Sequence, residues 1–211
     1  MYERVEKNIK SIRKNQKLGN LLKSAASEIK LSKKSRTQYL FSLCVALFLS
    51  YITVYKSNTI STMLNAVETI NNSSLAIIGI VFGTYAIFQA LMTDAVIWAM
   101  LESENNLLDI GNRSFLHLIL LYWIEIMVNI VLIIFLKALP EEFCLIDNLM
   151  LTNFLAFLLS TIYFAYCFLL FYELKNFAVN LFQMFNVYNI CRGLEVLEKK
   201  YDEDSEDEEL Q

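Results

Sequence analysis

The sequence is poor in the residues that build tight turns and metal sites. Its 211 residues include one proline, five glycines, one histidine and four cysteines. A β-barrel needs many turns, and so few turn-forming residues argue against one. The long apolar segments also lack the alternation of polar and apolar residues that is typical of strands. His117 has no second metal ligand three or four residues away, and the cysteines lack the spacing of a zinc site. We therefore expect neither a metal nor a cofactor.

Catalytic motifs are also missing. The chain has no glycine-rich phosphate loop, no nucleophile elbow and no HExxH sequence. These absences favour a protein that is not an enzyme.

Apolar residues are what the chain has in abundance. Hydrophobic residues make up 56% of it and charged residues 19%, which is more apolar than a soluble domain of this size requires. A helix of roughly 20 apolar residues crosses the hydrocarbon of a bilayer. The sequence therefore predicts an all-α, polytopic membrane protein with four transmembrane helices, at about 39–55, 75–101, 115–136 and 150–172.

The distribution of Lys and Arg predicts the orientation in the membrane. Residues 1–37 carry eleven of the 18, whereas only Lys56 and Lys137 lie at the opposite ends of the apolar segments. The positive-inside rule then places both termini in the cytoplasm, as expected for a protein of the inner (cell) membrane. Four parts follow: a basic arm (1–37), a transmembrane domain (38–172), an amphipathic stalk (173–200) and an acidic tail (201–211) that we expect to be disordered.

The basic arm has apolar residues at helical spacing among its positive charges. This pattern is typical of an amphipathic helix on anionic lipid headgroups, or of a topology signal that packs under the bundle. No aromatic residues interleave with the basic ones to stack on bases, so nucleic acid is not the favoured partner. The candidate lipid-surface residues are Lys7, Lys10, Arg13, Lys14 and Lys17.

The second apolar segment combines a small face with a polar one. Small residues at three- and four-residue spacing allow helices to pack closely in lipid. The polar face includes Tyr85 and Gln89, and we expect Gln89 near the depth of Glu125. The small face leads to Asp94, which lies nearer the cytoplasm. The candidate packing residues are Gly79, Gly83, Ala86 and Ala90.

Glu125 lies at the middle of the third apolar segment, on one face with Tyr122 and Asn129. A carboxylate at the bilayer centre costs at least about 2.5 kcal/mol. No Lys or Arg lies at that depth, so an ion pair within the chain is not expected. Two interpretations stay open: an ionised group on an aqueous path, or a neutral link to a polar neighbour, with the candidates Gln89, Asn129, Ser160 and Thr161.

The stalk continues the helical spacing of the fourth segment. One face carries apolar residues and the other carries mostly uncharged polar residues, a composition that suits packing on other helices better than lipid binding. Three packing partners stay open: other helices, the basic arm, and a neighbouring subunit. The last of these would make the protein a homo-oligomer, which is the assembly that we expect. The candidate assembly residues are Leu174, Phe177, Leu181, Met184 and Tyr188.

This layout resembles that of small four-span bacterial membrane proteins of anti-phage defence systems. The shared features are four spans with short loops, the absence of an enzyme domain, and cytoplasmic arms such as Lys7–Lys34 and Leu174–Leu197. The families in question are the membrane component of Kiwa and the four-span effectors of nucleotide-signalling systems. The resemblance implies a role in defence and assigns no role to individual residues.

Three functions stay open from the sequence. The leading hypothesis is a homo-oligomeric, pore-forming or membrane-perturbing effector gated from the cytoplasm, with a path lined by Gln89, Asp94, Glu125 and Asn129. The first alternative is a non-conducting scaffold or sensor that docks a cytoplasmic protein. The second is a proton-coupled carrier of small solutes that uses Glu125.

Overall fold

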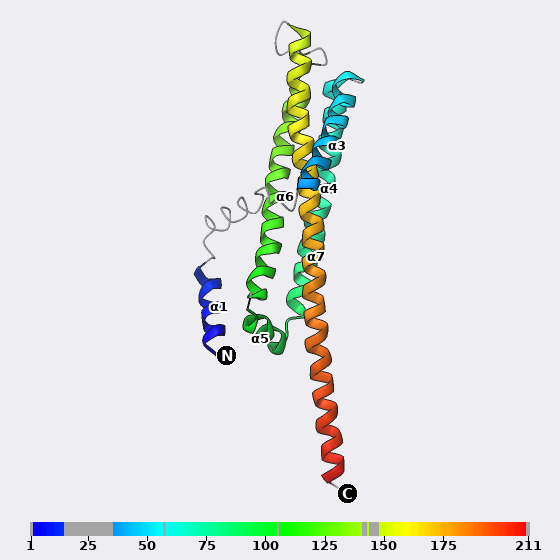
Figure 1. The fold of residues 1–211 in the computed structure, drawn as a ribbon. Coiled ribbons are helices and arrows are strands. Elements are labelled where there is room, and N and C mark those ends of the chain that lie inside the picture. The colour runs from blue at the N-terminus through cyan, green and yellow to red at the C-terminus, as the bar shows by residue number, and fades with distance from the viewer. Residues whose placement is uncertain are drawn as a thin grey trace. The chain divides into compact units, whose positions relative to one another are not determined.

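Helices account for all the regular secondary structure in the residues that the structure describes. It is a computed structural model that describes residues 2–14, 36–56, 58–104, 106–140, 143 and 148–209. The helices are α1 (Tyr2–Lys14), α3 (Arg36–Tyr55), α4 (Thr59–Ala90), α5 (Asp94–Glu102), α6 (Leu107–Ala138) and α7 (Leu149–Glu209) (Figure 1). Four of them, α3, α4, α6 and α7, are long and apolar enough to cross a membrane. The all-α class with four membrane-length helices is therefore confirmed.

The second apolar segment has different ends from those expected. We predicted one segment over 75–101, but α4 ends at Ala90 and α5 begins at Asp94. Thr93 caps α5, because its side-chain oxygen accepts a hydrogen bond from the Val96 amide at 3.4 Å. A threonine cap followed by an acidic first residue is a strong helix start, and it outweighs the continuous hydropathy of the segment.

At its other end α4 begins 16 residues earlier than expected, at Thr59. The polar stretch around Ser73 lies inside the helix. Its hydroxyls donate to carbonyls one turn back, Thr69 to Asn65 at 2.8 Å and Ser73 to Thr69 at 2.9 Å. Hydroxyl groups that bond their own helix in this way do not interrupt it.

The last helix, α7, runs without a break from Leu149 to Glu209. The boundaries at 172/173 and 200/201 are thus not helix ends, and the backbone of residues 202–209 is helical where we expected disorder. A helix that is already formed upstream extends one residue at a time without a new nucleation cost, and Glu has a good helix propensity.

The chain divides into two compact units, which are described separately. We call residues 24–82 and 118–175 the bundle unit, and residues 1–23, 83–117 and 176–211 the arm unit.

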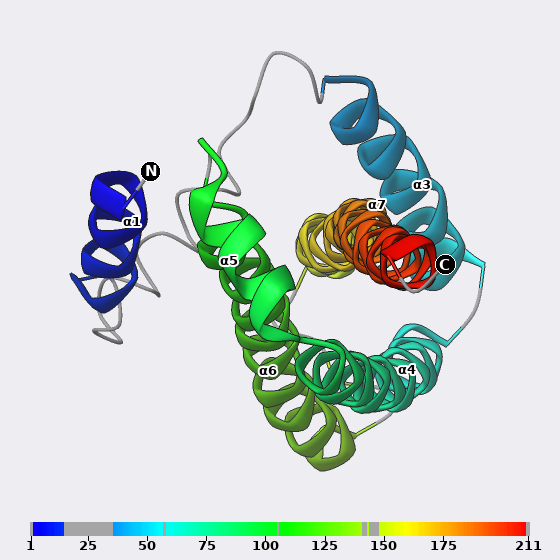
Figure 2. The same ribbon diagram turned by 90° about the horizontal axis from the view of Figure 1, so that it is seen from below.

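In the bundle unit, α3, α4 and α6 lie around α7 (Figure 2). Its core contains Ala46 of α3, Val67 of α4, and Tyr163, Phe164 and Cys167 of α7. Many large apolar side chains of the unit are exposed, among them Phe48, Val131, Ile134 and Ile162. An apolar exterior around an apolar core is typical of helices that contact lipid.

In the arm unit, Phe115 of α6 is the centre of an aromatic cluster. Its ring lies 5.0 Å from that of Tyr85, 5.6 Å from that of Phe88 and 4.8 Å from that of Phe177 (centroid distances). The cluster thus joins α4, α6 and α7 within this unit.

Candidate functional site

Glu125 is buried in the bundle unit, with 2% of its surface exposed. Its Oε2 atom accepts a hydrogen bond of 2.7 Å from the hydroxyl of Ser74, which joins α6 to α4. Among the ion pairs of the described residues, none includes Glu125. The carboxyl group thus has a neutral partner, as the absence of Lys and Arg at this depth predicted.

Asn129 lies one helical turn after Glu125 and is fully buried. Its Oδ1 atom accepts a hydrogen bond of 2.9 Å from the hydroxyl of Tyr163 on α7. Its Nδ2 atom has no hydrogen-bond partner in the part of the chain that the structure describes. A buried amide with unused donors is costly, so this amide is a candidate contact for a water molecule or a ligand.

Tyr122 completes the polar face of α6. It is 1% exposed, and its hydroxyl donates to the backbone oxygen of Leu170 at 3.5 Å. The structure therefore buries Tyr122, Glu125 and Asn129 together, with partners on both α4 and α7. We call these three residues, together with Ser74 and Tyr163, the polar cluster.

The other candidate path residues lie in the arm unit. Gln89 donates to the Oδ1 atom of Asn112 at 3.4 Å, and Tyr85 packs against Phe115. Asp94 is exposed at the start of α5. Gln89, one of the four candidate partners of Glu125, thus bonds Asn112 in the arm unit, and the hydroxyl that Glu125 accepts from is that of Ser74.

Ser74 is the functional candidate that sequence reasoning missed. We took it for the outer end of a transmembrane segment, whereas α4 extends 15 residues before it. Ser160 and Thr161, two other expected partners, instead donate to carbonyl oxygens of their own helix at 2.7 Å. A signal was present: Val67, Ser74 and Val81 recur every seven residues, and all three are buried.

The small face of α4 is open. A Cβ atom built at Gly79 or Gly83 would meet no other atom within 4 Å, and Ala86 and Ala90 are exposed. Within the described residues, then, this face packs against no helix of its own chain. Its use in packing between subunits stays a prediction.

Two of the candidate assembly residues of the stalk are buried within the arm unit. Phe177 is 8% exposed and packs against Phe115, and Met184 is 9% exposed. A Cβ atom at Gly111 of α6 would approach the Met184 side chain to 2.7 Å, which shows how closely the two lie. Leu181 and Tyr188 are half-buried here, as Leu174 is in the bundle unit. The face therefore packs on helices of its own chain, one of the three expected alternatives.

The helix of the basic arm, α1, contacts α5. Val5 is 5% exposed, and Asn8 donates to the carbonyl oxygens of Leu101 at 2.7 Å and Ser103 at 3.3 Å. The last carbonyls of a helix have no partner within it, so Asn8 caps α5 from outside.

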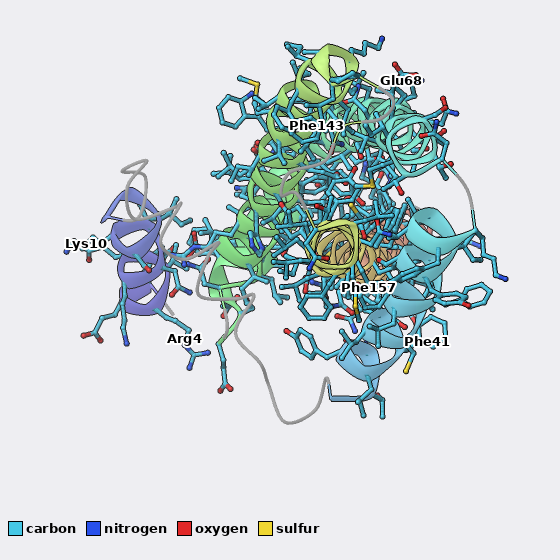
Figure 3. All side chains as sticks on the ribbon, turned by 90° about the horizontal axis from the view of Figure 1, so that it is seen from above. Arg4, Lys10, Phe41, Glu68, Phe143 and Phe157 are labelled. Carbon is cyan, nitrogen blue, oxygen red and sulfur yellow. The ribbon has the colours of Figure 1, made fainter. Side chains whose placement is uncertain are left out.

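The described basic side chains of α1 are exposed, and one of them forms an ion pair within the helix. Arg4, Lys7 and Lys10 are exposed, and Arg4 and Lys10 extend away from the helix (Figure 3). Lys10 pairs with Glu6 at 2.7 Å and thereby lowers the pKa of that carboxyl. The side chains of Arg13 and Lys14, and the whole of Lys17, lie outside the described residues.

A cavity of about 740 Å³ opens in the bundle unit where α3 and α6 end and α4 and α7 begin. We call it the helix-end cavity. Tyr163 of the polar cluster forms part of its wall, as do Leu132 of α6 and Ser160 of α7. Phe143, labelled in Figure 3, lines it from the connection between α6 and α7.

Comparisons with protein families, curated proteins and solved structures find no match for this chain. The polar cluster and the surfaces of the two units are therefore the features of this chain that bear on its function.

Proposed function

We propose that the chain is a homo-oligomeric protein of the inner (cell) membrane, with both termini in the cytoplasm, that passes ions when its cytoplasmic segments receive a signal. The observation that carries the proposal is Glu125: a carboxyl group buried among four membrane-length helices, with a hydroxyl as its partner. Ionisable groups at such positions mark ion and proton paths in membrane proteins.

The composition of the polar cluster supports a path rather than a simple helix link. A pair of hydroxyl or amide groups can join two helices in lipid without the free-energy cost of placing a carboxylate there. Glu125 adds that cost, and Asn129 beside it has unused amide donors. A path needs such groups, because a moving ion or water chain exchanges its hydrogen bonds with them.

The arm unit supports control from the cytoplasm. Asn8 of α1 caps α5, and Phe177 of α7 packs against Phe115 of α6, so α1 and α7 both contact helices of the middle of the chain in this unit. A signal that binds α1 or α7 would thus act on the helices that lead to the polar cluster. The layout of four spans with cytoplasmic arms suggests that such conduction would perturb the membrane as part of anti-phage defence.

The test is ion flux through liposomes that contain the purified protein, with the variant Glu125→Gln beside the wild type. Gln has nearly the same size as Glu and carries no charge, so we expect single-channel current to change several-fold while the oligomer size stays constant. Glu104→Gln is the matched control, because it removes an exposed carboxylate between α5 and α6. Equal currents in all three proteins, or no current from folded wild type in any condition, would contradict the proposal.

A second candidate function is a scaffold that docks a cytoplasmic protein, and the far end of α7 favours it. Ile190, Leu194, Leu197 and Tyr201 recur at four- and three-residue spacing and are 55% to 74% exposed. A helix with such a stripe in water usually has a partner helix.

Replacing both Leu194 and Leu197 by Asp should then abolish recovery of the partner from membranes. Val196→Asp is the control, since Val196 is equally exposed and lies off this face. Recovery that survives the double substitution would exclude this stripe as the docking face.

A further inference from the structure

We propose that the helix-end cavity holds one acyl chain of a bilayer lipid. The cavity belongs entirely to the bundle unit and receives residues from α3, α4, α6 and α7. This binding site is independent of ion conduction and would exist in a scaffold as well.

The size of the cavity rules out an empty space. At about 740 Å³ it would take the place of about 25 water molecules in bulk liquid, which occupy roughly 30 Å³ each. Interiors of proteins are packed with few voids larger than one water molecule. Something must therefore fill it, either water or an apolar group.

The hydrogen bonds of the wall favour the apolar group. Thr53 donates to the Leu49 carbonyl at 2.8 Å, Ser160 donates to the Ala156 carbonyl at 2.7 Å, and Tyr163 donates to Asn129 at 2.9 Å. These side chains line the cavity, yet each directs its donor into the protein. A water cluster needs two to four polar partners per molecule, and this wall provides few.

The wall of the cavity is long enough to accommodate the hydrocarbon of one leaflet of the membrane. Along α7 its wall runs from Leu149 to Tyr163, and 14 helical residues rise about 21 Å. The hydrocarbon of one leaflet is about 15 Å thick, half of the roughly 30 Å core. An acyl chain that enters at the helix ends thus spans the cavity.

The polarity of the cavity changes along this length. Asn58 and Thr59 lie at the start of α4, and Thr152 and Asn153 lie in the first turn of α7. Farther from these helix ends the wall includes Leu132, and the hydroxyls of Ser160 and Tyr163 there donate to other groups of the protein. Polar helix ends next to an apolar wall suit a lipid, whose ester groups stay at the interface while its chain is buried.

The side wall leads to the bilayer. Phe135 of α6 and Leu159 of α7 both line the cavity, yet they are 53% and 64% exposed. The cavity therefore reaches the apolar outer surface of these two helices, which the lipid contacts. This continuity is why we assign a lipid of the surrounding bilayer rather than a soluble apolar molecule.

The first experiment uses the wild-type full chain in vesicles of phosphatidylethanolamine and phosphatidylglycerol. A fraction of the lipid carries a diazirine in its acyl chain, and mass spectrometry maps the crosslinks. We expect crosslinks to concentrate on the lining residues Leu136 and Ala156 over the exposed residue Ile162. An even distribution over the lipid-facing surface would overturn the proposal.

The second experiment fills the cavity. Ala156→Phe puts a ring into the space, and Ile162→Phe adds similar bulk on the outer face of the same helix. Native mass spectrometry of protein in mild detergent should show one retained phospholipid per chain in the wild type and in Ile162→Phe, and a loss of at least fivefold in Ala156→Phe. Glu125→Gln should retain the lipid, which separates this site from the conduction proposal.

Full retention by folded Ala156→Phe, or a retained molecule that is not a lipid, would overturn the assignment. If Ala156→Phe does not fold, the crosslink map of the wild type still decides the question.

Discussion

Two polar links join α4 to α6 in the bundle unit, and they differ in depth. Next to the end of α6, the Nζ atom of Lys137 lies 2.8 Å from Oε1 of Glu68 on α4, and the two side chains are 58% and 37% exposed. Deeper in the unit, the Ser74 hydroxyl lies 2.7 Å from Oε2 of Glu125, and both residues are 2% exposed. The distances are nearly equal, but the first link pairs two charges and the second pairs a carboxyl group with a neutral hydroxyl.

This difference follows from the cost of removing charge from water. Two ions that are both buried lose more hydration free energy than their attraction returns unless their geometry is excellent. At the exposed ends of the helices that loss is small, so an ion pair forms there at little cost and contributes little. At depth, a hydroxyl satisfies the carboxyl group and adds no second charge. The comparison predicts that the neutral link contributes more to stability than the ionic one.

The largest effect is expected from Ser74→Ala. The substitution removes the hydroxyl that donates to the buried carboxyl group of Glu125, and an unsatisfied buried group costs about 1–3 kcal/mol. The free energy of unfolding, measured in mild detergent, should fall by that amount. Ser73→Ala is the matched control, because Ser73 is exposed and its hydroxyl bonds a carbonyl of its own helix. Equal losses in the two variants would show that depth is not what matters.

A middle effect is expected from Tyr163→Phe. Removal of the hydroxyl leaves the Oδ1 atom of Asn129 without its donor, and interhelical hydrogen bonds in membrane proteins contribute about 0.6 kcal/mol on average and up to about 1.7 kcal/mol. We expect a loss in this range by the same unfolding measurement. Tyr55→Phe, at a ring that is 48% exposed, should change stability little. A loss in Tyr163→Phe above that of Ser74→Ala would reverse the proposed order within the polar cluster.

The sequence was sufficient to predict the helical class and the four membrane-length helices, because long apolar segments carry this information directly. It left open whether Glu125 is ionised or neutral, and its four candidate partners for Glu125 did not include Ser74. The ends of α4 were not predictable from hydropathy, because Thr93 caps a separate helix, α5, and the hydroxyl of Ser73 bonds a carbonyl of its own helix, which stays unbroken there. Both effects come from local hydrogen bonds, which an average of hydropathy along the segment does not detect.

The choice of Gln89 as a candidate partner depended on the same error. Because we placed the start of α4 too late in the sequence, we expected Gln89 at the depth of Glu125, where the structure has Ser74 instead. The seven-residue recurrence of Val67, Ser74 and Val81 contains the correct register, because residues at that spacing share one helix face. The partner of Glu125 in this protein is thus the one serine in an otherwise apolar stripe of α4, and not the longer polar side chain of Gln89.

The smallest effect is expected from Glu68→Gln, and its dependence on salt tests the comparison most directly. An exposed ion pair contributes about 0–1 kcal/mol, and the Debye length of about 10 Å at 0.1 M salt falls to about 3 Å at 1 M. The loss of unfolding free energy in Glu68→Gln should therefore be below that of Ser74→Ala at low salt and should disappear at high salt. In protein that has received no signal, the loss in Ser74→Ala should stay constant across the same titration, because Glu125 is only 2% exposed in this structure. If added salt reduced the losses of unfolding free energy in both variants, the polar cluster would be open to water. Depth would then not explain why Glu125 has a neutral partner.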